Sequence, residues 1–300
     1  MFRSRPFGVL VVAVALVAAA CSSGGGDIDG PTIKVGSANF SESALVAEVY
    51  AQALEAEGYS VDRKLNVGSR EIYKTALESG ELDLLPEYIG TMLTFLGGEA
   101  SSDSAATHTA LQAAWEPLGI SVLDPAPAQD KNGLVVTKET AAELGLSQTS
   151  DLANFNGTLV FGGPPECPSR DFCLIGLQSL YGLDFAEFKP LDVGGPITVT
   201  ALESGEIDVA LLFTSSGVIL AKEFVLLDDD KGLQPAENLA PAVRTEILDF
   251  YGDRFANVLN AVSRALTTTE LIALNKAVEV DGEDPDKVAS DWLDALGLGG

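Results

Sequence analysis

The sequence is short of the residues on which metal and nucleophilic chemistry depend. Its 300 residues contain one histidine (His108), three cysteines, and 18 lysines and arginines against 44 aspartates and glutamates, for a net charge of −26. One imidazole cannot build a histidine-rich metal site, and a Ser-His-Asp triad would have to use His108. The excess of negative charge repels phosphate backbones and anionic membrane surfaces. We therefore expect no metal ion, no cofactor and no nucleic-acid partner.

The N-terminus carries positive charge ahead of an apolar stretch. Two arginines precede this stretch, which ends in small residues and Cys21, and a run of serine and glycine follows. This order is typical of a secretory signal, and the terminal cysteine resembles a bacterial lipoprotein signal. We expect residues 1–20 to be a signal peptide, Cys21 to be lipidated, and residues 21–31 to form a flexible tether. A soluble secreted protein with a different cleavage point is the alternative.

The other two cysteines, Cys167 and Cys173, lie close together in the stretch CPSRDFC. Export places them in an oxidising compartment, where two neighbouring thiols normally join. We expect a local disulfide. The alternative is a reactive thiol, which here has no neighbouring histidine to activate it.

Apolar residues make up 46% of the chain, enough for the cores of one large or two ordinary domains. From Thr32 onward, short β-branched runs alternate with longer helical stretches. The runs predict strands near residues 32–36, 59–65, 82–84, 120–123, 134–137, 158–162, 207–213 and 224–227. From Val243 onward the pattern predicts helices only. This order indicates an α/β protein built on mostly parallel sheets.

An internal repeat divides the mature chain into two similar units. Residues 75–83 read TALESGELD and residues 200–208 read TALESGEID. Upstream, a predicted strand ending at Gly36 corresponds to one ending at Gly162. The repeated stretch is typical of a helix that ends at a glycine and leads into a strand, so we interpret it as a structural joint.

The loops that follow the two joints carry candidate ligand-binding residues. Tyr88 and Thr91 follow the first repeat, and Phe213, Thr214 and Ser215 follow the second. Ligands of open α/β sheets bind beyond the carboxyl ends of the strands. Two units with matching loops therefore predict a cleft between two lobes.

Four segments resemble the extracytoplasmic solute-binding proteins of ABC importers for glycine betaine, choline and carnitine. They are VGSANFSES, ELDLLPEYIGT, FGGPPECPSR and LLDDDKGLQPAENLAPAVR. The resemblance implies a two-lobe, periplasmic-binding-protein-like fold of type II, with two mostly parallel sheets, flanking helices and a ligand cleft. It implies a lobe I of residues 32–128 plus 235–300 and a lobe II of residues 129–234.

The resemblance also implies a cage of aromatic residues from four loops around a quaternary ammonium. Tyr88 matches the first cage position and Phe213 the second, whereas Asn132 and Glu237 stand at the other two. Arg170 keeps the place of an arginine that pairs with a ligand carboxylate. The full predicted set is Asn39, Ser41, Tyr88, Thr91, Asn132, Arg170, Phe213, Thr214, Glu237 and Asn238.

Several of these residues have a structural alternative. Arg170 could pair only with the neighbouring Asp171 at the surface. Tyr88 and Phe213 could belong to the core, and Asn39 and Ser41 could cap the helix that follows them. Glu237 could be a solvated loop glutamate, as is usual in so acidic a chain.

The resulting hypothesis is a lipid-anchored, monomeric solute receptor outside the cytoplasmic membrane, with no enzymatic activity, that hands its solute to ABC permease and ATPase subunits. Half of the aromatic cage is absent, which leaves open a larger polar or aromatic solute. A carboxylate-dependent hydrolase and a sensor or adhesin with the same fold are further alternatives, although no nucleophile and base are paired in the sequence.

Overall fold

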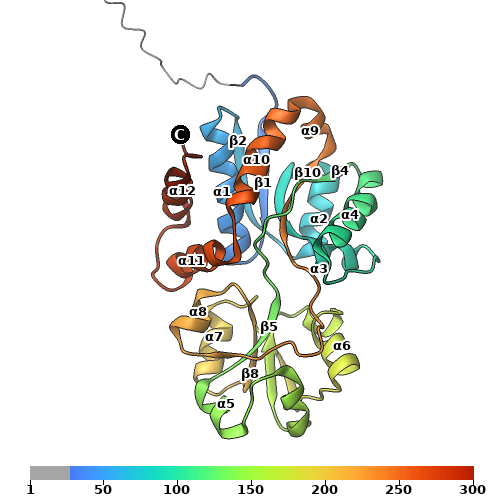
Figure 1. Ribbon diagram of the computed structural model, residues 1–300, viewed down its shortest axis with the longest axis vertical. Helices are drawn as coiled ribbons and strands as arrows, with labels where there is room; N and C mark the ends of the chain where they lie inside the picture. The colour runs from blue at the N-terminus through green and yellow to red at the C-terminus, as the bar shows by residue number, and fades with distance from the viewer. Residues whose placement is uncertain (1–27) are drawn as a thin grey trace, which may run out of the picture.

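The computed structural model describes residues 28–300, which form two α/β lobes joined by two extended segments (Figure 1). The predicted signal peptide, Cys21 and most of the predicted tether lie outside the described residues. Within residues 28–300, none of the helices is both long and apolar enough to cross a membrane.

Lobe I contains a five-stranded sheet in the order β2-β1-β3-β10-β4. Its strands are β1 (Ile33–Ala38), β2 (Val61–Gly68), β3 (Leu84–Tyr88), β4 (Ile120–Val122) and β10 (Leu239–Arg244). The helices that surround it are α1 (Ser41–Ala56), α2 (Arg70–Ser79), α3 (Ile89–Phe95), α4 (Ser104–Trp115), α9 (Thr245–Tyr251), α10 (Asp253–Ala265), α11 (Thr268–Glu279) and α12 (Pro285–Leu296). One apolar core joins the sheet to α1 and α9–α12, and a second joins it to α2, α3 and α4. Strand β3 is buried throughout because helices cover both faces of the sheet.

Lobe II contains a second five-stranded sheet in the order β7-β6-β8-β5-β9. Its strands are β5 (Asn132–Val136), β6 (Val160–Gly163), β7 (Glu187–Pro190), β8 (Val209–Phe213) and β9 (Val225–Leu226). Its helices are short: α5 (Lys138–Leu144), α6 (Leu174–Gly176), α7 (Pro196–Glu203) and α8 (Gly217–Ala221). Two apolar cores again lie on opposite faces of the sheet.

The predicted two-lobe α/β fold is confirmed, but both sheets are mixed rather than mostly parallel. Strand β10 pairs antiparallel with β3 and β4, and β5 pairs antiparallel with β8 and β9. The reason is the path of the chain. Strands β5 and β10 follow the segments that cross between lobes, so they enter their sheets at the cleft, where β3 and β8 end.

Strands β7 and β10 were not predicted from the sequence. Strand β10 lies in the middle of its sheet although it contains Pro241, a residue that normally argues against a central strand. The carbonyl of Pro241 accepts a hydrogen bond from the N–H of Leu123 at 2.9 Å, so the strand still pairs on that side.

The internal repeat is confirmed as a structural joint. Helices α2 and α7 are each followed by a glycine in the left-handed region, Gly80 with φ +78° and Gly205 with φ +71°. After each glycine an aspartate, Asp83 or Asp208, accepts a backbone N–H of the neighbouring strand β1 or β6, at 3.0 and 2.8 Å. The repeated residues therefore align a helix, a strand and its neighbour in each lobe.

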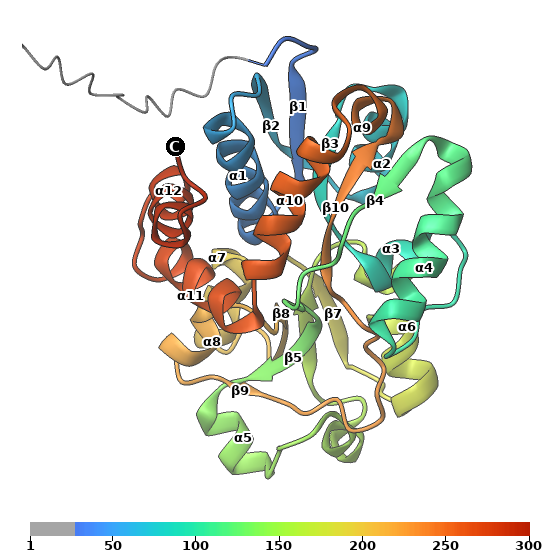
Figure 2. The same ribbon diagram turned by 45° about the horizontal axis from the view of Figure 1, so that its top comes forward.

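Two segments, residues 123–131 and 227–238, connect the sheets, and Gln129 pairs with Asn238 in an isolated antiparallel bridge between them. After the second segment the chain returns to lobe I, where α10 and α12 pack against α1 (Figure 2). Helix α11 also contacts α8 of lobe II. Their backbones lie so close that a Cβ at Gly217 would come within 2.5 Å of the Lys276 Cα.

Candidate ligand-binding cleft

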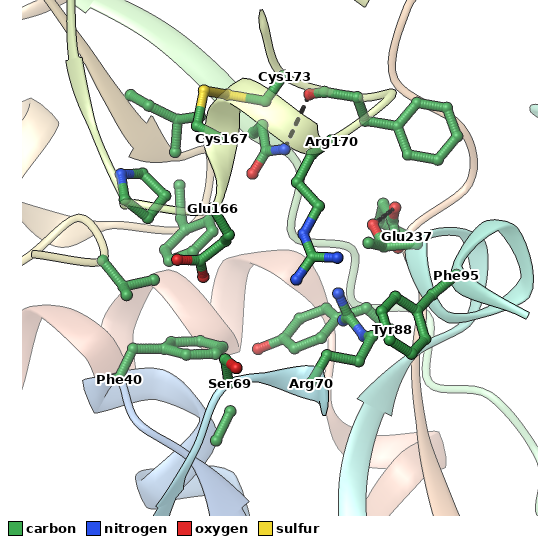
Figure 3. A pocket seen from close by; sticks show the side chains of 18 of the residues that line it. Phe40, Ser69, Arg70, Tyr88, Phe95, Glu166, Cys167, Arg170, Cys173 and Glu237 are labelled. Atoms are coloured by element: carbon green, nitrogen blue, oxygen red, sulfur yellow. Dashed lines mark hydrogen bonds between the residues drawn. A yellow bond between two sulfur atoms is a disulfide. The ribbon is translucent and has the colours of Figure 1, made fainter. Parts of the chain in front are cut away.

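A cavity of about 320 Å³ lies between the lobes, at the carboxyl ends of β3 and β8 (Figure 3). This volume is at the lower end of the range of small-molecule sites. Both lobes line it, with residues from the starts of α1, α2 and α3, from the loop between Cys167 and Cys173, and from the second crossing segment.

Six aromatic residues line the cavity, and three of them lie close together although they come from different segments. Phe40 precedes α1, Tyr88 ends β3, and Phe213 ends β8. The ring centroids of Phe40 and Phe213 are 5.1 Å apart, and those of Phe40 and Tyr88 are 6.0 Å apart. Phe40 and Phe213 belong to different lobes, so their contact spans the cleft. An aromatic face attracts a cation by roughly 0.5–2 kcal/mol when water is excluded.

The hydroxyl of Tyr88 is held by the carboxylate of Glu42, which lies in the first turn of α1. The hydroxyl donates to Glu42 Oε1 at 2.6 Å, and Glu42 Oε2 accepts from the hydroxyl of Ser215 and from Asn275 Nδ2. Burial raises the pKa of Glu42. Burial and the charge of Glu42 also raise the pKa of the adjacent Asp130 well above its usual range. Because its hydroxyl is occupied, Tyr88 offers the cavity its ring.

Arg70 begins α2 and is positioned by Glu87, which is completely buried in β3. Arg70 Nη2 donates to Glu87 Oε1 at 2.8 Å, and the Tyr73 hydroxyl donates to Glu87 Oε2 at 2.7 Å. The Arg70 guanidinium points into the cavity beside Phe95 (Figure 3). Glu87 therefore orients a cationic group whose other face is open to a ligand.

Arg170 enters the cavity from lobe II. Its Nη2 donates to Glu71 Oε1 of α2 at 2.6 Å, and its guanidinium carbon lies 5.3 Å from the ring centroid of Phe95. Both contacts cross the cleft. In Figure 3 the guanidinium groups of Arg70 and Arg170 point toward one another across the cavity. Two guanidinium groups that face one space suit an anion, such as a carboxylate, which accepts paired hydrogen bonds.

The loop that carries Arg170 is closed by a disulfide between Cys167 and Cys173, whose Cα atoms are 5.3 Å apart. Inside the loop, the N–H of Arg170 donates to the Cys167 carbonyl, and the N–H of Cys173 donates to the Arg170 carbonyl, both at 3.1 Å. The disulfide and these turns restrict the backbone from which Arg170 extends.

Glu237 is buried in the wall of the cavity, with 2% of the residue exposed, and is not the solvated loop glutamate of the alternative interpretation. Its Oε1 accepts from the hydroxyl of Thr91, whereas its Oε2 is buried without a hydrogen-bond partner among the described residues. Burial raises the pKa of Glu237 to about 7, against the lowering effect of Thr91 and of the charge of Arg70. A residue that lines the cavity therefore has one carboxyl oxygen without a protein partner.

The structure brings most of the predicted ligand-binding residues together at this cavity. Those that line it are Asn39, Tyr88, Thr91, Asn132, Arg170, Phe213 and Glu237. At the two cage positions without an aromatic residue, Asn132 Nδ2 donates to the Phe172 carbonyl at 3.0 Å, and the buried Glu237 Oε2 has no partner among the described residues.

Three predicted residues, Ser41, Thr214 and Asn238, lie outside the lining. Ser41 is exposed at the start of α1, and Phe40, one residue earlier, faces the cavity instead. Thr214 Oγ1 accepts a backbone N–H of the first crossing segment at 2.9 Å. Asn238 Nδ2 donates to a backbone carbonyl of the same segment at 2.8 Å. The last two side chains satisfy backbone groups where the lobes join.

Sequence reasoning missed Phe40, Arg70, Glu87 and Phe95. The sequence did contain a signal for Arg70, because it follows Val67-Gly68-Ser69, which corresponds to Val193-Gly194-Gly195 in the second repeat. In the second repeat, proline replaces this arginine. When a charged residue is present in only one of two copies of a repeat, the difference indicates a specialised function for that residue.

Residues 31–295 match the family described as the substrate binding domain of the ABC-type glycine betaine transport system. The chain belongs to this family. Members bind small solutes outside the cytoplasm and act with the permease and ATPase subunits of an ABC transporter. The family is one of solute-binding proteins rather than enzymes.

Relatives and solved structures agree with this assignment. The chain is 29% identical to a glycine-betaine-binding protein of Pseudomonas aeruginosa over 274 residues, which cover 87% of each chain. It is 26% identical to a carnitine transport binding protein of Listeria monocytogenes, covering 96% of this chain and 94% of the relative. A crystal structure described as a glycine betaine/carnitine/choline ABC transporter matches with a TM-score of 0.72 and 25% identity, over 89% of this chain and 99% of that one.

Proposed function

We propose that this substrate-binding protein captures a small zwitterionic or cationic quaternary ammonium solute between its lobes. The observation that carries the proposal is the convergence of Phe40, Tyr88 and Phe213 on a cavity that two guanidinium groups also face. A quaternary ammonium has no N–H, so aromatic faces are its natural partners. A carboxylate on the same solute would bind between Arg70 and Arg170.

Capture requires the lobes to close on the solute. We place the lobe boundaries at residues 129 and 234, in the two crossing segments, and these segments act as the hinge. Phe213 and Arg170 of lobe II would then meet Phe40 and Glu71 of lobe I only in the closed form.

The mature protein acts as a monomer on the outer face of the membrane, anchored through a lipidated Cys21. The serine- and glycine-rich residues that follow give the body a flexible tether. Removal of residues 1–20 leaves 16 basic residues against 44 acidic ones, a net charge of −28. This charge repels anionic lipid headgroups and attracts a cationic solute at low salt.

Isothermal titration of the mature domain with glycine betaine, choline, carnitine and ectoine tests the proposal. The uncharged carbon analogue of choline, 3,3-dimethylbutan-1-ol, is the matched control ligand. We expect binding of at least one ammonium solute, and none of the carbon analogue at the same concentration. Phe213→Leu removes a ring while keeping an apolar side chain, and should weaken binding roughly two- to thirtyfold. Absence of binding to every ammonium solute would refute the proposal.

A further inference from the structure

We propose that Glu237 determines the specificity of the cleft: its Oε2 accepts a hydrogen bond from an O–H or N–H of the solute. The site would therefore prefer a quaternary ammonium solute that carries such a donor to one that carries none. This inference rests on the proposed function. It specifies which solutes within the proposed class the site prefers.

The first argument is the unused oxygen itself. In the described part of the chain, four buried side-chain polar atoms have no hydrogen-bond partner, on Trp115, Glu237, Asn238 and Asn275. Of these residues, Glu237 alone lines the cavity. A buried acceptor without a partner is unfavourable, and native structures contain few of them. An acceptor of this kind in the wall of a ligand site is explained by a donor that arrives with the ligand.

The second argument is that none of the neighbouring protein donors is bonded to Oε2. The hydroxyl of Thr91 donates to the other oxygen, Oε1. Arg70 pairs with Glu87, and Arg170 pairs with Glu71. A solute donor is therefore the partner that the site still lacks.

The third argument is that the carboxyl group is held in place. The backbone of α3 approaches it so closely that a Cβ at Gly90 would lie 3.1 Å from Glu237 Oε1 and 2.6 Å from the Ala236 carbonyl oxygen. Together with the bond from Thr91, this contact keeps the side chain from turning toward solvent. A fixed acceptor distinguishes ligands better than a mobile one, because it cannot find another partner when the donor is missing.

The site would therefore discriminate among quaternary ammonium solutes. Glycine betaine carries no O–H and no N–H, whereas choline and carnitine each carry one hydroxyl. A solute without a donor would leave Oε2 buried and unpaired in a site that the ligand has emptied of water.

Two pairs of similar ligands, one member of each with the hydroxyl donor and the other without it, provide the test. The first pair is L-carnitine and γ-butyrobetaine, which lacks the hydroxyl; the second is choline and its methyl ether. By isothermal titration at pH 8, the wild type should bind the hydroxyl-bearing member roughly ten- to a hundredfold more tightly, as expected for a hydrogen bond to a charged acceptor. In Glu237→Leu this ratio should fall to about one, and in Glu237→Gln it should be intermediate.

Retained binding of γ-butyrobetaine by Glu237→Leu would show that the variant folds. Glu166→Gln is the charge-matched comparison, because Glu166 is a second glutamate in the lining, and it should keep the preference. Equal affinities within both pairs in the wild type would overturn the inference and leave the proposed function standing. The inference would also be overturned if the preference for the hydroxyl-bearing ligand survived in Glu237→Leu, or if it disappeared only in Glu166→Gln. Failure of all four ligands to bind would overturn the inference, and the proposed function would fall with it only if glycine betaine also failed to bind.

Discussion

Replacing Glu237 with glutamine should change how the stability of the protein depends on pH. A glutamate in an unfolded chain has a pKa of 4.5, whereas burial raises the pKa of Glu237 in the native protein to about 7. Between these two values the native protein holds a proton that the unfolded chain has released. The contribution of this carboxyl to the free energy of unfolding therefore falls as the pH rises from 4.5 to 7.

The size of the effect follows from the two pKa values. Each pKa unit corresponds to about 1.4 kcal/mol, so between pH 5 and pH 8 this carboxyl should cost the wild type roughly 2 to 3 kcal/mol of stability. Below pH 4.5 the group is neutral in both states and contributes nothing. Glutamine has nearly the same shape, does not titrate, and can still accept the hydrogen bond from Thr91.

Urea denaturation at pH 5, 6, 7 and 8, followed by circular dichroism, measures the difference between wild type and Glu237→Gln. Relative to the wild type, the variant should gain roughly 2 to 3 kcal/mol between pH 5 and pH 8. Glu42 and Glu279, two other buried acids with raised pKa values, are present in both proteins, so their contributions cancel in the difference. The charge of Glu237 contributes to the raised pKa of Asp130, so the change at Asp130 acts in the same direction. Glu143→Gln, on an exposed position of α5, controls for the loss of one negative charge. Parallel pH curves for wild type and Glu237→Gln would refute the burial argument.

Three further predictions concern the closure of the lobes, the disulfide and the anchor. Arg170→Ala removes the contact with Glu71 across the cleft and should shift the unliganded protein toward open lobes by roughly two- to fivefold, measured by fluorescence transfer between labelled lobes; an unchanged distribution would contradict a role in closure. The unreduced mature domain, once unfolded, should show no free thiol from Cys167 or Cys173, and replacing both with serine should lower the free energy of unfolding by about 2 kcal/mol; two reactive thiols would disprove the bond. Cys21→Ser should move the protein from the membrane fraction to the medium or periplasm, which fractionation and immunoblotting detect, and a variant that stays in the membrane would exclude lipidation as the anchor.

The elements that depend on local chemistry were predictable from the sequence. The glycines of the repeat predict the ends of α2 and α7, because only glycine enters the left-handed region at little cost. The aromatic and hydroxyl residues after the two repeats predict a cleft, since loops at the carboxyl ends of strands in the two lobes converge. Strand β10 was not predicted because a proline such as Pro241 disfavours a central strand. In the structure, the carbonyl of Pro241 still accepts a hydrogen bond from Leu123, which keeps the strand paired on that side.

The composition of the site was predictable in part. Tyr88, Phe213 and Arg170 carry the family pattern, and they line the cavity. Arg70 and Glu87 could not be identified, because one charged residue near a helix start and another in a strand give no sign of pairing until the sheet brings them within 2.8 Å.

The sequence by itself determined the two α/β units, their repeated joint and the loops that meet at the cleft, because each is encoded by neighbouring residues. The tertiary structure alone decided the direction of β5 and β10, the pairing of Arg170 with Glu71 across the cleft, and the burial of Glu237. The reason is that burial and charge pairing depend on which distant segments meet. Glu237 becomes a buried acceptor with a raised pKa and one free oxygen only where α3 and the second crossing segment close over it.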